Sequence, residues 1–261
     1  MVVLAYSSLE IFYLSTRQYI MKFHHKIADR FGYELIRKKR HPSANSHLSN
    51  VIKHYKIDLV LDVGANVGQF AMRLRKNGYS GEIHSFEPGL DAYGKLCSNS
   101  QRDNLWVAHH LALGHETGKI DINVSQSSDL SSILNPNPFG LDRFEKIKVV
   151  KQEAVSITTI DLFAEEHIRD FKNRRVLLKM DTQGFDLNVF RGAKKSVDNI
   201  LCMQSEISFC PIYESMPNYT ESLELYQNSG FAISGLYPVS RKRDMTVIEM
   251  DCIMINSRCC G

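Results

Sequence analysis

The chain has 261 residues, of which 43% are hydrophobic and 23% charged, so it has the composition of a globular protein and not of a disordered or fibrous one. Its formal net charge is only +3, from 32 basic and 29 acidic residues, so no global field points to nucleic acid or to an anionic membrane. The six cysteines form no CxxC pair and are too few for a disulfide-rich secreted domain, which favours a reducing, cytoplasmic location.

Residues 1–45 differ from the rest of the chain, and we expect them to form a helical and basic extension. Residues 1–21 are rich in aliphatic side chains, but Glu10 and Arg17 interrupt them before the ~20 apolar residues that a membrane-spanning helix needs. The favoured interpretation is an amphipathic helix that packs on the domain or on a second subunit of a homo-oligomer, and peripheral membrane contact is the alternative. Residues 22–41 are basic, which suits lipid headgroups or another polyanion as well as a solvated linker.

Residues 46–261 show short apolar runs that alternate with amphipathic stretches, which predicts one α/β domain with a mostly parallel sheet and helices on both faces. Turn signals between short polar segments at 114–155 predict an inserted group of antiparallel strands and loops at the mouth of the site. The strands expected in the main sheet are 59–63, 82–86, 105–109, 176–180, 200–207 and an antiparallel edge pair, 231–237 and 246–255. The expected helices are 69–77, 91–98, 158–168 and 187–196.

The segment DVGANVG at 62–68, between the first strand and the first helix, is the most informative in the chain. Its glycines allow a ligand to lie against the backbone in the crevice at the carboxyl ends of the strands. Its spacing, G-x-N-x-G, differs from the G-x-G-x-x-G of dinucleotide sites, and Asp62 would repel a pyrophosphate but suits an ammonium and a sulfonium. Glu87, after the second strand, is placed to accept hydrogen bonds from ribose hydroxyls.

S-adenosylmethionine meets these conditions better than NAD does, and it is the expected cofactor. The residues expected to bind it are Asp62, Gly64, Asn66, Gly68, Gln69, Phe70, Glu87, Pro88 and Ala112.

Three motifs together resemble FkbM-type methyltransferases: DVGANVG at 62–68, FEP at 86–88, and LKMDTQGFD at 178–186 followed by FRGA at 190–193. The resemblance runs from about residue 58 to residue 255. It implies a Rossmann-like class I methyltransferase fold with a seven-stranded sheet, and S-adenosylmethionine-dependent transfer, mostly to oxygen on sugars or polyketide-derived small molecules. Gln183 stands where the family often carries an acidic residue.

A hydroxyl acceptor requires a base, and Asp181 is the first candidate because it ends a buried strand at the same sheet edge as Asp62. The alternative role for Asp181 is to cap the helix that begins near Asp186. Lys179, on the same face of that strand, is the expected counter-ion of Asp181. Glu206 is the second candidate base, or a ligand of a divalent cation shared with Asp181, although no ligand spacing supports a metal and none is predicted.

For the acceptor, we expect Ser128, Gln183 and the ring of Tyr213 to contact a glycan or small molecule. Nucleic acid is not expected as a partner, because the basic run lies outside the catalytic domain. The expected activity is therefore O-methyl transfer. The alternatives are a nicotinamide-dependent oxidoreductase and a non-catalytic module that binds S-adenosylmethionine.

Overall fold

The computed structural model describes residues 20, 22–33, 35 and 42–259. By its internal contacts the chain divides into two units, Met1–Ser43 and Ala44–Gly261. In the first unit, residues 22–30 are helical. For residues 22–41 the sequence had suggested either a solvated linker or a contact with lipid headgroups or another polyanion. The amphipathic helix expected over residues 1–21 lies outside the described residues except for Ile20.

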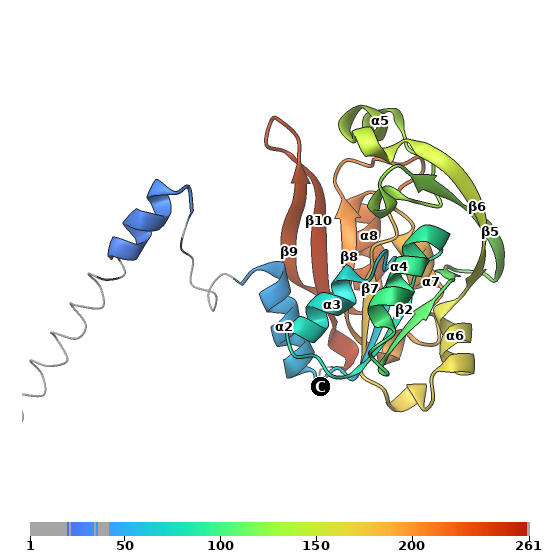
Figure 1. Cartoon of the computed structure of the whole chain (residues 1–261). Helices are drawn as coiled ribbons and strands as arrows, with labels where there is room; N and C mark the ends of the chain where they lie inside the picture. Colours follow the sequence, from blue (N-terminus) through green and yellow to red (C-terminus); the bar gives the residue numbers. More distant parts are fainter. Residues whose placement is uncertain (1–19, 21, 34, 36–41, 260–261) are drawn as a thin grey trace, which may run out of the picture. The chain divides into compact units, whose positions relative to one another are not determined.

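The second unit is built on a seven-stranded sheet with the strand order β3-β2-β1-β7-β8-β10-β9 (Figure 1). The strands from β3 to β8 in this order are parallel, and β10 is antiparallel to both of its neighbours. The expected mostly parallel sheet with an antiparallel edge is therefore confirmed. Its strands are β1 (Leu59–Val63), β2 (Glu82–Phe86), β3 (Trp106–His109), β7 (Val176–Met180), β8 (Ile200–Ser208), β9 (Phe231–Arg241) and β10 (Val247–Asn256).

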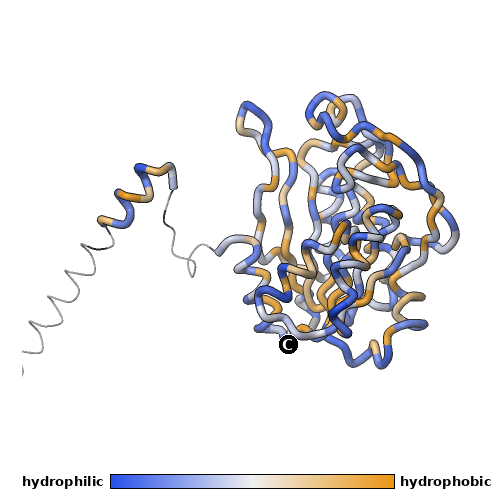
Figure 2. Tube along the Cα trace, viewed as in Figure 1, coloured by the Kyte–Doolittle hydropathy of each residue, from blue (hydrophilic) through white to orange (hydrophobic). Residues whose placement is uncertain are grey.

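Helices cover both faces of this sheet. Phe70 packs in one apolar cluster with Val60, whereas Phe163 packs in another with Leu61, on the opposite face of the same strand. All five residues of β1 are buried, as a strand covered on both faces requires, and Figure 2 shows the apolar segments gathered along the sheet. The helices of the first face are α2 (Ala44–His54), α3 (Gln69–Lys76) and α4 (Leu90–Ser100), and those of the second are α6 (Ile160–His167), α7 (Asp186–Arg191) and α8 (Tyr219–Asn228).

The segment between β3 and α6 forms a second, three-stranded sheet in the order β4-β6-β5. Strands β5 and β6 are antiparallel, which confirms the antiparallel insertion expected here. Ile122 of β5 joins the main core, so the insertion is packed against the domain. The elements of this segment are β4 (Ala112–Leu113), β5 (Gly118–Ser125), η1 (Ser128–Leu130), α5 (Pro138–Arg143), η2 (Glu145–Ile147) and β6 (Val149–Thr158).

Four helices differ from the expectation, because α2, α5 and α8 were not expected and α7 is shorter than expected. Helix α7 ends at Arg191 and not at Ser196, because the carboxylate of Asp161 accepts the backbone N–H groups of Lys195 and Ser196 and turns the chain there. Helix α8 was not expected, although its capping box, built on Asn218, is a signal that the sequence contains.

The ends of β1 and β7 meet at one close backbone contact. Gly64 has a φ of +73°, and a Cβ atom built on it would overlap the carbonyl oxygen of Asp181. The N–H of Asp181 in turn donates to the carbonyl oxygen of Val63 at 3.1 Å. A residue without a side chain at position 64 therefore allows the two motif loops to lie side by side at one edge of the sheet.

This contact predicts a difference between two glycine substitutions. Gly78 also has a positive φ, +86°, but no atom lies within 4 Å of its Cβ position. Gly78→Ala should therefore cost only the backbone strain, about 1–2 kcal/mol of unfolding free energy. Gly64→Ala adds the overlap with Asp181 and should cost a further ~1–3 kcal/mol. Urea unfolding followed by circular dichroism measures both, and equal losses would contradict the proposed constraint.

Candidate active site

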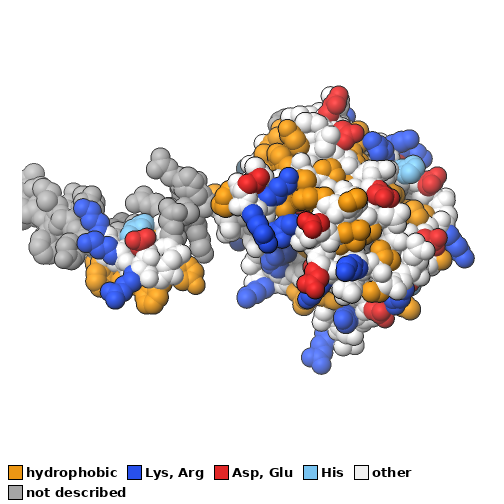
Figure 3. All heavy atoms as spheres, turned by 90° about the horizontal axis from the view of Figure 1, so that it is seen from above, with side chains coloured by type: hydrophobic (Ala, Val, Ile, Leu, Met, Phe, Trp, Pro, Cys, Tyr) orange, Lys and Arg blue, Asp and Glu red, His pale blue; other side chains and the backbone are white. Residues whose placement is uncertain are grey.

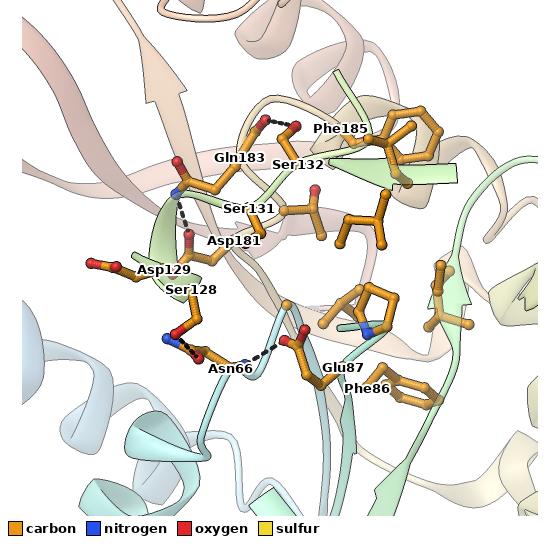
Figure 4. Close-up of a pocket in the computed structure, with 18 of the residues that line it drawn as sticks. Asn66, Phe86, Glu87, Ser128, Asp129, Ser131, Ser132, Asp181, Gln183 and Phe185 are labelled. Carbon is orange, nitrogen blue, oxygen red and sulfur yellow. Dashed lines mark hydrogen bonds between the residues drawn. The ribbon is translucent and has the colours of Figure 1, made fainter. Parts of the chain in front are cut away.

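One pocket lies at the carboxyl ends of β1, β2 and β7 and is closed on one side by the β5–β6 insertion (Figure 4). Gly64 and Asn66 reach it from the loop after β1, Glu87 from the end of β2, and Asp181 from the end of β7. Because β1 pairs in parallel with both β2 and β7, these three strand ends are adjacent. The sheet order thus brings the cofactor loop and the second motif to one site.

Glu87 is 7% exposed and faces this pocket. Its Oε2 accepts the N–H of Asn66 at 2.7 Å, and its Oε1 accepts the N–H of Gly89 at 2.8 Å. Burial raises the pKa of Glu87 to about 7, although these two N–H donors act in the opposite direction. Each carboxylate oxygen has a second lone pair, so Glu87 can still accept a pair of hydrogen bonds from a neighbouring diol.

Asp62 does not face the pocket, which contradicts the expectation that it meets the charged end of the cofactor. It is 0% exposed, and its Oδ1 lies 3.1 Å from Nζ of Lys179 while its Oδ2 accepts the hydroxyl of Ser85. Nζ of Lys179 also donates to the carbonyl oxygen of Gly64 at 3.0 Å. The carboxylate of Asp62 is therefore compensated by a buried lysine, and it holds the loop rather than a ligand.

Gly68 and Phe70 also lie outside the pocket. A Cβ atom on Gly68 would lie 2.6 Å from the ring of Trp106, so this glycine allows close packing of the loop. Phe70 is 4% exposed, and Nζ of Lys179 lies 5.6 Å from the centre of its ring. The other residues expected to bind the cofactor do line the pocket: Gly64, Asn66, Gln69, Glu87, Pro88 and Ala112.

Of the candidate bases, Asp181 lines the pocket and Glu206 does not. The side chain of Asp181 is 40% exposed, and its Oδ2 lies 3.5 Å from Nζ of Lys179, the counter-ion expected for it. Burial and then the carboxylate of Asp181 raise the pKa of Glu206 well above its ordinary value. The alternative role for Asp181 as a helix cap is contradicted, because α7 has Phe185 at its N-cap and no side-chain cap there.

Lys179 itself is 3% exposed and does not line the pocket. Burial alone would lower its pKa, but the carboxylates of Asp62 and Asp181 outweigh this effect and raise it well above the ordinary value. Lys179 is thus a fixed cation behind the pocket, between two carboxylates.

Gln183 holds Asp181 in place. Its Nε2 donates to Oδ1 of Asp181 at 3.1 Å, and its backbone carbonyl accepts the hydroxyl of Ser132 at 2.7 Å (Figure 4). Its Oε1 accepts the hydroxyl of Tyr213 at 3.0 Å. Its φ of +52° is the left-handed conformation, so the motif turns sharply at this residue. The amide that replaces the family's acidic residue therefore donates to a carboxylate where a second carboxylate would repel it.

Of the three residues expected to bind the acceptor, two line the pocket and one does not. Ser128 and Gln183 line the pocket, and the hydroxyl of Ser128 donates to Oδ1 of Asn66 at 2.9 Å (Figure 4). Tyr213 is 1% exposed, so its ring cannot stack on a sugar. Tyr213 contributes through its hydrogen bond to Gln183 instead.

The apolar wall of the pocket was missed in the sequence. Leu111 precedes the short strand β4 and Leu113 is its last residue, Ile122 and Ile133 come from the insertion, and Phe185 lies within the second motif. Such side chains have no local signal that distinguishes them from core residues. Among the residues that the structure describes, no group of three or more His, Cys, Asp or Glu is arranged to hold a metal ion.

Comparison with known proteins agrees with the motifs. The family model described as Methyltransferase FkbM domain matches residues 62–233. "Methyltransferase 1" of Beauveria bassiana is 23% identical over 195 residues, which are 67% of this chain and 72% of that protein. Among solved structures, an rRNA methylase from Streptococcus thermophilus is similar at 11% identity and a TM-score of 0.42, over 85% of this chain and 98% of that one. A magnesium protoporphyrin IX methyltransferase from Synechocystis is similar at 9% identity and a TM-score of 0.43, over 82% and 79%.

The buried ion pair predicts an unusual pH dependence for the variant Lys179→Met. Without the lysine, the carboxylate of Asp62 is buried and uncompensated, so the unfolding free energy should fall by about 3–5 kcal/mol at alkaline pH. A carboxyl whose pKa is raised by folding destabilises the fold above that pKa, and this penalty disappears as the pH falls and the group binds a proton. Urea unfolding at alkaline and mildly acidic pH measures the effect.

The double variant Lys179→Met with Asp62→Asn is the control for this prediction. It removes both charges and should recover part of the loss at alkaline pH, because no uncompensated carboxylate is left at position 62. A loss that is the same at both pH values, and that the double variant does not reduce, would contradict the account.

Proposed function

This chain belongs to the FkbM methyltransferase family, and we propose that it transfers the methyl group of S-adenosylmethionine to a hydroxyl oxygen of a sugar, glycan or other small metabolite. One observation carries the proposal. A single pocket has an apolar wall beside Glu87 and, on the side of Asp181, a group of polar residues that we call the mouth. The wall suits a nucleoside, and the mouth suits an acceptor hydroxyl.

The residues of the wall fit the cofactor. Glu87 has the free lone pairs to hold the two ribose hydroxyls, and the side chains of Leu111, Leu113 and Ile122 offer an apolar surface for adenine. In this proposal Asp62 does not contact the cofactor. It keeps the glycine loop in place through its ion pair with Lys179. When bound, S-adenosylmethionine supplies a methyl group already activated by a sulfonium.

The mouth suits a neutral, hydroxyl-rich acceptor. It carries the hydroxyls of Ser128 and Ser131, the carboxylates of Asp129 and Asp181, and the amide of Gln183. Within the described part of the chain, no lysine or arginine lines this pocket. Carboxylates accept hydrogen bonds from hydroxyls but repel phosphates, so the site disfavours a nucleic acid or a phosphorylated acceptor.

The chain contributes position and a base. Holding the acceptor oxygen in line with the methyl carbon can supply ~7–11 kcal/mol of the barrier in well-oriented systems. As the oxygen–carbon bond forms and the sulfur–carbon bond breaks, the carboxylate of Asp181 takes the hydroxyl proton. Gln183 fixes one oxygen of Asp181, and Lys179 lies beside the other.

Of the two alternatives, the nicotinamide-dependent oxidoreductase is disfavoured by the family and by the G-x-N-x-G loop. A non-catalytic module would keep the cofactor site but not the transfer. The two substitutions below, at Glu87 and Asp181, separate these functions.

Glu87→Gln should weaken S-adenosylmethionine binding by about 10- to 100-fold in calorimetric titration, because an amide accepts fewer hydrogen bonds from the ribose. The pKa of Glu87 is about 7, so the affinity of the unchanged protein should fall by up to about tenfold per pH unit below that value, as the carboxylate is protonated. The affinity of the variant should not change over this range.

Loss of the fold does not explain this result. At alkaline pH, Glu87→Gln removes the cost of a buried charge but also loses one of the two N–H hydrogen bonds, so its unfolding temperature should stay close to that of the unchanged protein. Exposed Glu145 provides the matched control, Glu145→Gln, which should bind normally. Binding of NAD in place of S-adenosylmethionine would refute the cofactor assignment.

Asp181→Asn should bind S-adenosylmethionine nearly normally but transfer methyl groups ~10²–10⁴-fold more slowly, because the acceptor proton has no base to receive it. Release of S-adenosylhomocysteine is measured with sugars, each paired with its deoxy or O-methylated analogue. A labelled methyl donor then distinguishes O–CH₃ from N–CH₃ products by the chemical shift of the methyl carbon. Glu206 does not line the pocket, so Glu206→Gln should retain most of the activity.

Two outcomes would contradict this proposal. Turnover of amines with no turnover of hydroxyl acceptors would show a different acceptor class. S-adenosylmethionine binding with no turnover of any acceptor, equally in the unchanged protein and in Asp181→Asn, would favour the non-catalytic module.

A further inference from the structure

The helix at residues 22–30 carries an exposed apolar stripe. The exposed fractions are 51% for Ile20, 58% for Phe23, 45% for Ile27 and 72% for Phe31. These residues are spaced by three or four positions, so along the helix they lie on one side. Figure 2 shows apolar and polar segments alternating along this helix, and Figure 3 shows its apolar side chains gathered together. We call these four residues the apolar stripe.

Basic side chains border this stripe. Lys22, Lys26 and Arg30 follow one another at intervals of four, which places them in a second row along the helix. Lysine and arginine can keep their charges in water while their methylene stems lie against an apolar surface. An apolar row beside a cationic row is the arrangement of helices that lie in the plane of a membrane surface.

The charge of the chain is concentrated in the same segment. Residues 22–41 contain seven lysines and arginines against Asp29 and Glu34, a net charge of +5, whereas the whole chain carries only +3. The rest of the chain is therefore slightly acidic. The excess positive charge of the chain therefore lies in this segment, which also contains most of the apolar stripe.

We propose that the helix at residues 22–30 docks the protein on the surface of an anionic lipid bilayer, through the apolar stripe and the row of Lys22, Lys26 and Arg30. The apolar stripe enters the boundary between headgroups and acyl chains, and the lysines and arginines contact the acidic headgroups. No helix among the described residues is long and apolar enough to span a bilayer, so the contact is peripheral. This inference is independent of the proposed methyl transfer.

Other partners fit these observations less well. A nucleic acid would use the basic residues but leave Phe23 and Phe31 in water. A second copy of the helix would cover the apolar stripe but place two strongly basic segments against each other. A surface that covers the stripe would also stabilise the helix, because most helical stability comes from packing of an amphipathic face.

Vesicle flotation of the full chain tests this proposal. The protein should float with phosphatidylcholine vesicles that contain roughly a third phosphatidylglycerol, and at least about tenfold less with phosphatidylcholine alone or at high salt. Phe23→Ser combined with Phe31→Ser should lower the fraction bound to anionic vesicles by about tenfold or more. Lys22→Glu combined with Lys26→Glu should remove the preference for the anionic lipid.

The second unit supplies matched controls. Val150 is 58% exposed, as Phe23 is, and Val239 is 52% exposed, so Val150→Ser with Val239→Ser removes apolar surface elsewhere. Lys146→Glu with Lys148→Glu makes the same change of net charge at exposed positions outside the helix. All four control substitutions should leave flotation unchanged.

Three results would overturn the proposal. The first is flotation that does not depend on lipid charge or on Phe23 and Phe31. The second is binding to heparin or RNA that persists in the phenylalanine double variant while anionic vesicles are not bound, which would indicate a polyanion site. The third is self-association without vesicles that this variant abolishes, which would assign the apolar stripe to a second copy.

Discussion

The site depends on one buried cation. Nζ of Lys179 lies 3.1 Å from Oδ1 of Asp62, 3.0 Å from the carbonyl oxygen of Gly64 and 3.5 Å from Oδ2 of Asp181. It therefore connects the end of β1 to the end of β7, the strands followed by the glycine loop and by the candidate base. The carboxylates compensate the charge of this buried lysine, and the lysine in turn compensates the buried carboxylate of Asp62. The cofactor loop and the candidate base thus have one common support.

The two halves of the pocket use carboxylates differently. Glu87 is almost completely buried, and its pKa of about 7 means that its ionised form costs stability at neutral pH. Such a cost is typical of a group kept for binding rather than for folding. Asp181 stays partly exposed beside Lys179 and is oriented by Gln183, which the Tyr213 hydroxyl holds in turn. The hydrogen bonds from Gln183 and Tyr213 fix the orientation of the Asp181 carboxylate, which its ion pair with Lys179 alone would not fix.

The two units of the chain follow different physical rules. The second unit buries its apolar residues on both faces of a sheet, and its pocket presents carboxylates and hydroxyls. In the described part of the first unit, a helix exposes Phe23 and Ile27 beside a row of basic residues. In the combined proposals, one part of the chain selects a neutral acceptor by hydrogen bonds, and another selects a surface by charge and apolar contact. The small net charge of the whole chain conceals this division.

The sequence alone determined β1, β2 and β7 to the residue, the glycine loop and the position of Glu87 at its strand end, because buried parallel strands and turns are encoded by neighbouring residues. It also indicated the family through the three motifs at 62–68, 86–88 and 178–193. Only the tertiary structure decided that Asp62 faces Lys179 and not a ligand, that Tyr213 is buried behind Gln183, and that the insertion supplies Ile122 and Ile133 to the pocket wall. These features join residues far apart in the chain, and local patterns do not specify which of several buried partners a side chain meets.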